Sequence, residues 1–230
     1  MTSARWSLVV AALWLASAAL QVVASLERWV VAAGSWTRGD VSIEDHRFDY
    51  WWPADPWENV GAAAQLHGAG LLLLAIGVLL LPRAAPARRH GLDGAVAVVV
   101  AILFGFDGAH VLVSGLMGAP SPLQYVPLQL LLAGVTAIGL VVLAANRFAT
   151  SWPTALGCLV LVGATLPGYI VATFVIAPAI TGYQSFDTTP WTETIPAVWT
   201  ALAALLVLVT AAASAIRGSR RPSRGSPSRE

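Results

Sequence analysis

The sequence predicts an all-α membrane protein, a polytopic bundle of six transmembrane helices with both termini in the cytoplasm. Hydrophobic residues make up 57% of the chain and charged residues only 11%, and the mean hydropathy is +0.71. These values exceed what a soluble domain buries in one core. The chain also contains six apolar runs long enough to cross a bilayer, and its arginines favour one side of them.

Each predicted span is an apolar run bounded by charged residues, Pro or Gly, because about 20 apolar residues in a helix cross a hydrocarbon layer of roughly 30 Å. Together the spans form a predicted transmembrane domain, residues 1–216. No sequence repeat relates the two halves, so an inverted-repeat transporter is not inferred. The predicted spans are residues 6–26, 60–81, 94–117, 125–145, 152–180 and 195–216.

The first span lies between Trp6 and Trp29, and tryptophan prefers the membrane interface. A cleaved secretory signal is the alternative, because an arginine precedes the apolar run and small residues occupy positions 16–19. The apolar run continues through Val22 and Val23, which favours an uncleaved helix.

The fifth span is the longest, and it contains Pro167, Gly168 and Pro178. Proline removes a backbone donor and crowds the preceding turn of a helix. This span is therefore predicted to be kinked, tilted or broken.

The orientation follows from the arginines, because short basic loops are retained in the cytoplasm. All 13 basic residues are arginines, and three of them fall on the predicted outer side, at Arg28, Arg38 and Arg47. The remaining ten fall on the predicted inner side. These are Arg5, Arg83, Arg88, Arg89, Arg147, Arg217, Arg220, Arg221, Arg224 and Arg229.

Residues 217–230 are predicted to be a disordered basic cytoplasmic tail, because arginine alternates there with Ser, Pro and Gly and almost nothing apolar is left to bury. Its charge suits the anionic lipids of the inner leaflet. Docking to a membrane-protein partner is the alternative role. Nucleic acid is not an expected partner.

The stretch EDHRFDYWWPADPWE belongs to the predicted outer loop, residues 27–59. Tryptophan and tyrosine prefer the headgroup layer, so this acidic loop is expected to lie against the bundle or the lipid. In one interpretation its carboxylates only support topology and solvation, and in the other it is a lid over a site in the bundle. The predicted lid consists of Glu44, Asp45, His46, Asp49, Trp51, Trp52, Asp55, Trp57 and Glu58.

A cluster of polar residues is predicted inside the membrane. Four of them lie in the stretch FGFDGAHVLVSGLMG at spacings of three, four and three, which places them along one helix face. A histidine of the second span lies at a matching depth, roughly 10 Å below the outer boundary at 1.5 Å per residue. The predicted cluster consists of His67, Asp107, His110, Ser114 and Met117.

The same stretch is rich in glycine, which allows another helix or a flat ligand to approach closely. The glycines are Gly105, Gly108, Gly115 and Gly118.

Two interpretations of the polar cluster involve no bound metal. In the first, Asp107 and the histidines hydrogen-bond one another or neighbouring helices, and they stabilise packing or a partner interface. In the second, Asp107 takes part in proton or cation passage, with the histidines and outer acids such as Glu58 or Glu193 as a relay. An ionised carboxylate near mid-membrane costs at least about 2.5 kcal/mol, so something must satisfy it.

A third interpretation makes His67 and His110 metal ligands. Two imidazoles on facing helices can bind a b-type haem axially, or they can hold copper or another transition metal together with Asp107 or Met117. The single cysteine, Cys158, excludes an internal disulfide framework, a Cys-rich metal cluster and a CxxC redox pair.

Motifs of known enzymes do not occur: the sequence has no GxSxG elbow, no HExxH, no P-loop and no GxGxxG after a strand. The expectation is a small multi-pass protein of a bacterial plasma membrane, with a structural, accessory or transport-related role rather than an enzymatic one. A haem or metal-binding protein and a proton or cation pathway are the alternatives.

Overall fold

The structure, a computed structural model, describes residues 3–35, 48–53, 57–182 and 189–219, and these contain helices and no strands. Five helices are long and apolar enough to cross a membrane, as expected for a multi-pass membrane protein. They are α1 (Ser3–Leu26), α3 (Ala63–Ala84), α4 (His90–Met117), α5 (Val126–Arg147) and α9 (Thr194–Ser219).

The predicted break in the fifth span is confirmed. α6 (Trp152–Leu161) and the 3-10 turn Val162–Ala164 are followed by Thr165 in an extended conformation, and the chain bends by 64° there. Pro167 then lies in the first turn of the next segment, where its missing donor is tolerated. That segment consists of α7 (Leu166–Val171), a π turn (Ala172–Ile176) and α8 (Ala177–Thr181). The bundle therefore has five spans, or six if the bent pair is one span.

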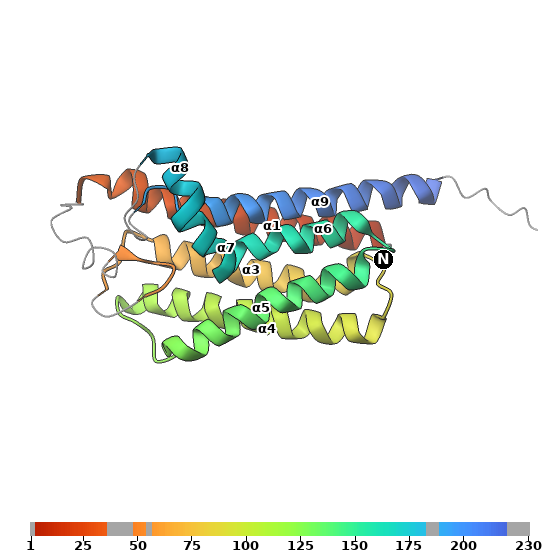
Figure 1. Cartoon of the computed structure of the whole chain (residues 1–230), viewed down its shortest axis with the longest axis horizontal. Helices are drawn as coiled ribbons and strands as arrows, with labels where there is room; N and C mark the ends of the chain where they lie inside the picture. The colour runs from red at the N-terminus through yellow and green to blue at the C-terminus, as the bar shows by residue number, and fades with distance from the viewer. Residues whose placement is uncertain (1–2, 36–47, 54–56, 183–188, 220–230) are drawn as a thin grey trace, which may run out of the picture.

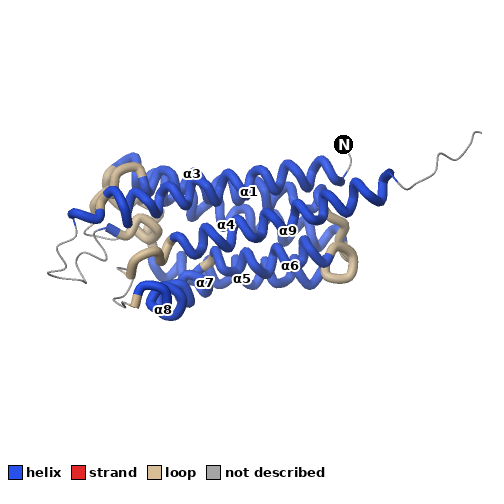
Figure 2. The backbone as a smooth tube through the Cα atoms, turned by 90° about the horizontal axis from the view of Figure 1, so that it is seen from above, coloured by secondary structure: helices blue, strands red, loops and turns tan. Residues whose placement is uncertain are grey.

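The helices run roughly parallel to one long axis (Figure 1). α1 packs against α3 and α9, α4 packs against α3 and α5, and α6 packs against α5 and α9. α1 begins and α9 ends at the same end of the bundle, here called the terminal end (Figures 1 and 2). The opposite end, which carries residues 48–53, is the loop end. With the start of α1 and the end of α9 at the same end, the chain crosses the bundle an even number of times, which agrees with six crossings. The assignment of the terminal end to the cytoplasm stays a prediction.

α3 and α4 approach each other closely at glycines. A Cβ atom on Gly68 would lie 2.5 Å from the backbone nitrogen of Leu112, and one on Gly108 would lie 2.9 Å from the Gly68 carbonyl oxygen. Gly115 is similarly close to Ala64. Helix contact therefore uses two of the four glycines predicted for close approach. Gly118 instead ends α4 with a φ of +67°, a conformation that favours glycine.

Apolar side chains fill the terminal-end half of the bundle. Trp14 of α1 is fully buried there, and its indole nitrogen donates to the Leu74 carbonyl at 3.3 Å. Val100 and Phe104 of α4 and Leu140 of α5 belong to the same apolar cluster. The polar residues of the predicted cluster lie beyond this core, in the loop-end half.

Two helices run past their predicted ends, because a helix, once formed, gains a hydrogen bond for each residue that it adds. α1 continues into a π turn, Glu27–Val31, and a 3-10 turn, Ala33–Ser35, so the start of the predicted outer loop is helical. α9 runs to Ser219, so the first three residues of the predicted disordered tail are helical as well. The rest of the tail lies outside the described residues.

Candidate functional site

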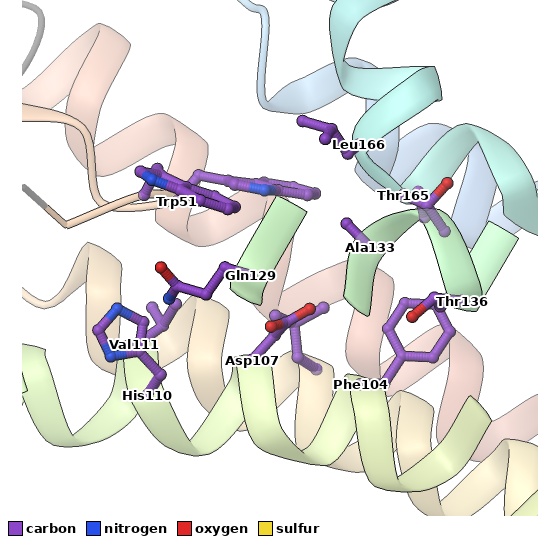
Figure 3. A pocket seen from close by; sticks show the side chains of 13 residues that line it. Trp51, Phe104, Asp107, His110, Val111, Gln129, Ala133, Thr136, Thr165 and Leu166 are labelled. Atoms are coloured by element: carbon purple, nitrogen blue, oxygen red, sulfur yellow. The ribbon is translucent and has the colours of Figure 1, made fainter. Parts of the chain in front are cut away.

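A small cavity lies in the loop-end half of the bundle, between α4, α5 and the break after α6 (Figure 3). Its volume is about 30 Å³, room for one or two water molecules. In Figure 3, Asp107 and His110 rise from α4 into the space beneath Trp51. The polar residues that line it are Asp107, His110, Gln129, Thr136 and Thr165.

The Asp107 carboxylate has no protein partner among the described residues, none of which donates a hydrogen bond to it or forms an ion pair with it. It projects from α4 into the cavity (Figure 3). Counted along the helix from Met117, it lies about 15 Å from the loop end of α4. A carboxylate at this depth with no protein partner marks the cavity as the candidate functional site.

The other polar groups of the cavity include both donors and acceptors, because an amide and an imidazole each carry both kinds of group. Gln129 is only 4% exposed, and its Oε1 has no partner. Thr136 and Thr165 donate their hydroxyl hydrogens to the Leu132 and Val162 carbonyls at 2.9 and 2.6 Å. Their oxygens remain able to accept. The Asp107 carboxylate and the two threonine oxygens are therefore the acceptors for a ligand that donates hydrogen bonds or carries positive charge.

His110 and Ser114 connect α4 to the segment that follows it. Nδ1 of His110 lies 2.8 Å from Oγ of Ser121, and the backbone N–H of Ser121 donates to Oγ of Ser114 at 3.0 Å. Both contacts hold the connection between α4 and α5 against the helix. His110 and Ser114 of the predicted cluster therefore attach the α4–α5 connection to α4. His110 also lines the cavity, and its Nε2 has no partner.

Met117 and His67 have surroundings different from those of Asp107. Met117 is 56% exposed at the end of α4 and does not line the cavity. His67 is 1% exposed, and neither ring nitrogen has a hydrogen-bond partner. Its ring lies against Trp51 and Tyr50, with centroid distances of 4.4 and 5.4 Å. Tyr50 and Trp51 thus rest on His67, which is outside the cavity lining.

The geometry gives the metal and haem interpretations no support. Within the part of the chain that the structure describes, no three His, Cys, Asp or Glu side chains are grouped so that they could hold a metal ion. A cavity of about 30 Å³ is also far smaller than the roughly 300–1,000 Å³ of ordinary cofactor and ligand sites.

The roof of the cavity is held by a turn at Asp49. One carboxylate oxygen of Asp49 accepts the backbone N–H groups of Trp51 and Trp52 at 2.8 and 3.1 Å. The Trp57 indole donates to the Asp49 carbonyl at 2.8 Å, and Trp51 stacks on Tyr169 with a centroid distance of 5.1 Å. Of the predicted lid residues, Glu44, Asp45, His46 and Asp55 lie outside the described residues.

A buried ion pair connects this turn to two helix ends, and the sequence did not predict it. Arg28, after α1, pairs with Glu193, before α9, and its Nη1 lies 3.9 Å from Oδ1 of Asp49. The Trp29 indole also donates to Glu193 at 2.5 Å. Burial raises the pKa of Glu193 from 4.5 to about 7, against the opposing effect of Arg28. The sequence shows only that Arg28 follows the first predicted span and that Glu193 precedes the last one.

A second buried ion pair lies at the terminal end. Nη2 of Arg147 on α5 lies 2.5 Å from Oδ2 of Asp93 on α4, and the Asn146 amide donates to the other carboxylate oxygen at 3.2 Å. The predicted span began at residue 94, but α4 begins at His90 and includes Asp93. This pair fixes the α4–α5 contact far from the cavity.

No known protein family, curated protein or solved structure matches this chain.

Proposed function

We propose that this protein is a transport-related membrane protein that binds a proton or a small cation at Asp107. One observation carries the proposal. Among the described residues the Asp107 carboxylate has no protein partner, and it faces a small cavity in which two threonine oxygens can also accept hydrogen bonds.

The physical reason is the cost of the charge. An ionised carboxylate away from bulk water is expensive unless a cation, a proton or strong donors compensate it. No described side chain compensates Asp107, and no arginine lines its cavity. A bound proton or cation supplies the missing charge, and the indoles of Trp51 and Trp52 add attraction for a cation near their faces.

Access to the site is expected from the loop end. Phe104 and Leu71 line the cavity, and both belong to the apolar cluster that fills the terminal-end half. That half blocks a polar solute, whereas the roof is a short turn held by Asp49. Transport would therefore require Trp51 to move first and the apolar half to open afterwards.

Flux into liposomes tests this function. Purified protein is reconstituted with an internal pH-sensitive dye, and the dissipation of a pH gradient is followed with and without methylammonium. We expect the Asp107→Asn variant to reduce the rate to that of protein-free liposomes. Thr154→Val is the matched control, because Thr154 is buried in α6 and bonded to Thr210, away from the cavity. Unchanged flux in Asp107→Asn would rule the proposal out.

A structural role for the cluster is the second candidate, and the His110 and Ser114 contacts with Ser121 favour it. It predicts that Ser114→Ala and Asp107→Asn both lower the thermal midpoint of the protein in detergent. The transport proposal predicts that only Ser114→Ala does so, because Asp107 has no hydrogen bond or ion pair within the described residues to lose.

A further inference from the structure

Oxygen-bearing side chains from three separate segments of the chain line the Asp107 cavity. Asp107 belongs to α4, Thr136 belongs to α5, and Thr165 lies at the break between α6 and α7 (Figure 3). Each threonine hydroxyl donates its hydrogen to a nearby backbone carbonyl, that of Leu132 or Val162. The threonines therefore have only oxygen lone pairs left for a ligand in the cavity.

The helix break is an independent observation that points to an ion. Thr165 is extended, and the chain bends by 64° there. Irregular backbone inside a membrane span is tolerated where it lines a cavity. Broken membrane helices commonly form the ion sites of transport proteins, because the interrupted segment presents oxygens to the ion. In this protein the break lines the same cavity as Asp107.

The charge of the cavity fits one monovalent cation. Among the described residues Asp107 is the only carboxylate that lines it, and His110 is the only other titratable side chain there. The cavity-lining residues of α3, α5 and the break do not titrate, and Asp49 holds the roof without lining the cavity. One positive charge neutralises Asp107, whereas a divalent ion would keep an uncompensated charge among apolar side chains.

The available ligand atoms favour an alkali-metal cation over a transition metal. Transition metals prefer nitrogen and sulfur ligands, but Nδ1 of His110 contacts Ser121 and its Nε2 is buried. The groups that remain are the carboxylate and the two threonine oxygens. A spherical cation accepts oxygens from any direction, whereas an ammonium ion needs an acceptor along each N–H bond.

The size of the cavity requires the ion to lose most of its water. About 30 Å³ holds one or two water molecules, so a cation with a complete hydration shell does not fit. Oxygens of the protein must replace the lost waters, as they do in the selectivity filters of channels. Magnesium gives up its waters reluctantly, which also disfavours it here.

We propose that the cavity binds a dehydrated alkali-metal cation in competition with a proton, with Asp107, Thr136 and Thr165 as its oxygen ligands. This inference rests on the proposed function and names the ion that the site takes. When the cation enters, the O–H bond of the neutral Asp107 carboxyl breaks and the proton passes to water. A carboxylate–cation pair replaces the neutral carboxyl, so the net charge of the site does not change.

Direct binding of sodium tests the inference without requiring transport. Purified protein in detergent is attached to scintillation-proximity beads, and the binding of radioactive sodium is measured over a range of sodium concentrations and pH. We expect saturable binding that magnesium and choline do not displace. The half-saturating sodium concentration should rise as the pH falls, by up to about tenfold per pH unit, because one proton displaces one cation.

Threonine variants identify the ligands. Thr136→Val and Thr165→Val each remove one oxygen with little change of shape, and we expect each to raise the half-saturating sodium concentration about tenfold. Thr136→Ser and Thr165→Ser keep the oxygen and should bind sodium nearly as the unchanged protein does. Thr200→Val is the matched control, because Thr200 on α9 is buried, donates to the Pro196 carbonyl at 3.0 Å and does not line the cavity.

The outcomes distinguish this inference from the proposed function. Absence of saturable sodium binding, or unchanged binding in both valine variants, would overturn the ligand class and leave the flux result for Asp107→Asn standing. Displacement of sodium by methylammonium at lower concentrations than by unlabelled sodium would overturn it in the same way. Sodium binding and flux that both persist in Asp107→Asn would overturn the inference and the proposed function together.

Discussion

Arg28 and Glu193 lie 165 residues apart in the sequence and form an ion pair in which both side chains are buried. The pair joins the end of α1 to the start of α9, and Arg28 also faces Asp49, which holds the roof of the cavity. Changes at this pair therefore act on the roof, although neither residue lines the cavity.

The titration of Glu193 makes the stability of the loop end depend on pH. Its pKa of about 7 in the folded protein exceeds the ordinary value of 4.5, so the folded state holds this proton more tightly than the unfolded state. The resulting stability is fully present below pH 4.5 and is lost as the pH rises through 7. We expect the thermal midpoint in detergent to fall over this window, and Glu193→Gln to flatten the decrease. A parallel decrease in the variant would assign the effect to other groups.

The Asp49 turn holds the roof of the cavity, and under the proposed function the roof is the point of access. Asp49→Ala removes the acceptor for two backbone N–H groups, so Trp51 and Trp52 should lose their fixed positions. The measurement is maleimide labelling of a cysteine introduced at Thr136, in a Cys158→Ala background. We expect faster labelling in Asp49→Ala and nearly unchanged labelling in Asp49→Asn, whose side chain keeps one acceptor oxygen. Equal rates in all three proteins would contradict a lid.

The close contact of α3 with α4 requires glycine at position 68. In Gly68→Ala the new Cβ would meet the Leu112 backbone at 2.5 Å, so the helices must separate, and we expect a loss of about 1–3 kcal/mol in unfolding free energy. Gly134→Ala is the matched control, because a Cβ there meets nothing within 4 Å. Alanine also favours helix by up to about 1 kcal/mol, so the control should be neutral or stabilising. Unfolding in detergent measures both.

Removing one residue of the terminal-end ion pair should strongly lower the unfolding free energy of the protein. Asp93→Ala leaves Arg147 buried without its carboxylate, which is expected to cost about 3–5 kcal/mol. Arg83→Ala is the control, because Arg83 is an exposed arginine that contacts the Trp6 ring at 5.7 Å. Its loss should cost no more than about 1 kcal/mol. Similar unfolding free energies for the two variants would show that the Asp93 pair contributes little.

The helices could be predicted from the sequence because apolar length and proline position determine them locally. Which side chains line the cavity could not be predicted from the sequence. Two histidines at matching depths in the membrane can still point in different directions. In the structure the His67 ring lies against Trp51, and the His110 ring contacts Ser121. Gln129 was missed because it is a neutral residue in an apolar run, although a buried amide in a membrane helix is itself a signal.

The pairing of α1 with α9 also has a consequence for biosynthesis. Helix α1 is translated well before α9, against which it packs, and Oγ of Ser25 lies 2.5 Å from Oγ1 of Thr194 at that junction. Arg28 thus stays without Glu193 until position 193 has been translated. A nascent chain that stops before position 193 therefore has the Arg28 guanidinium beside α1 without the Glu193 carboxylate.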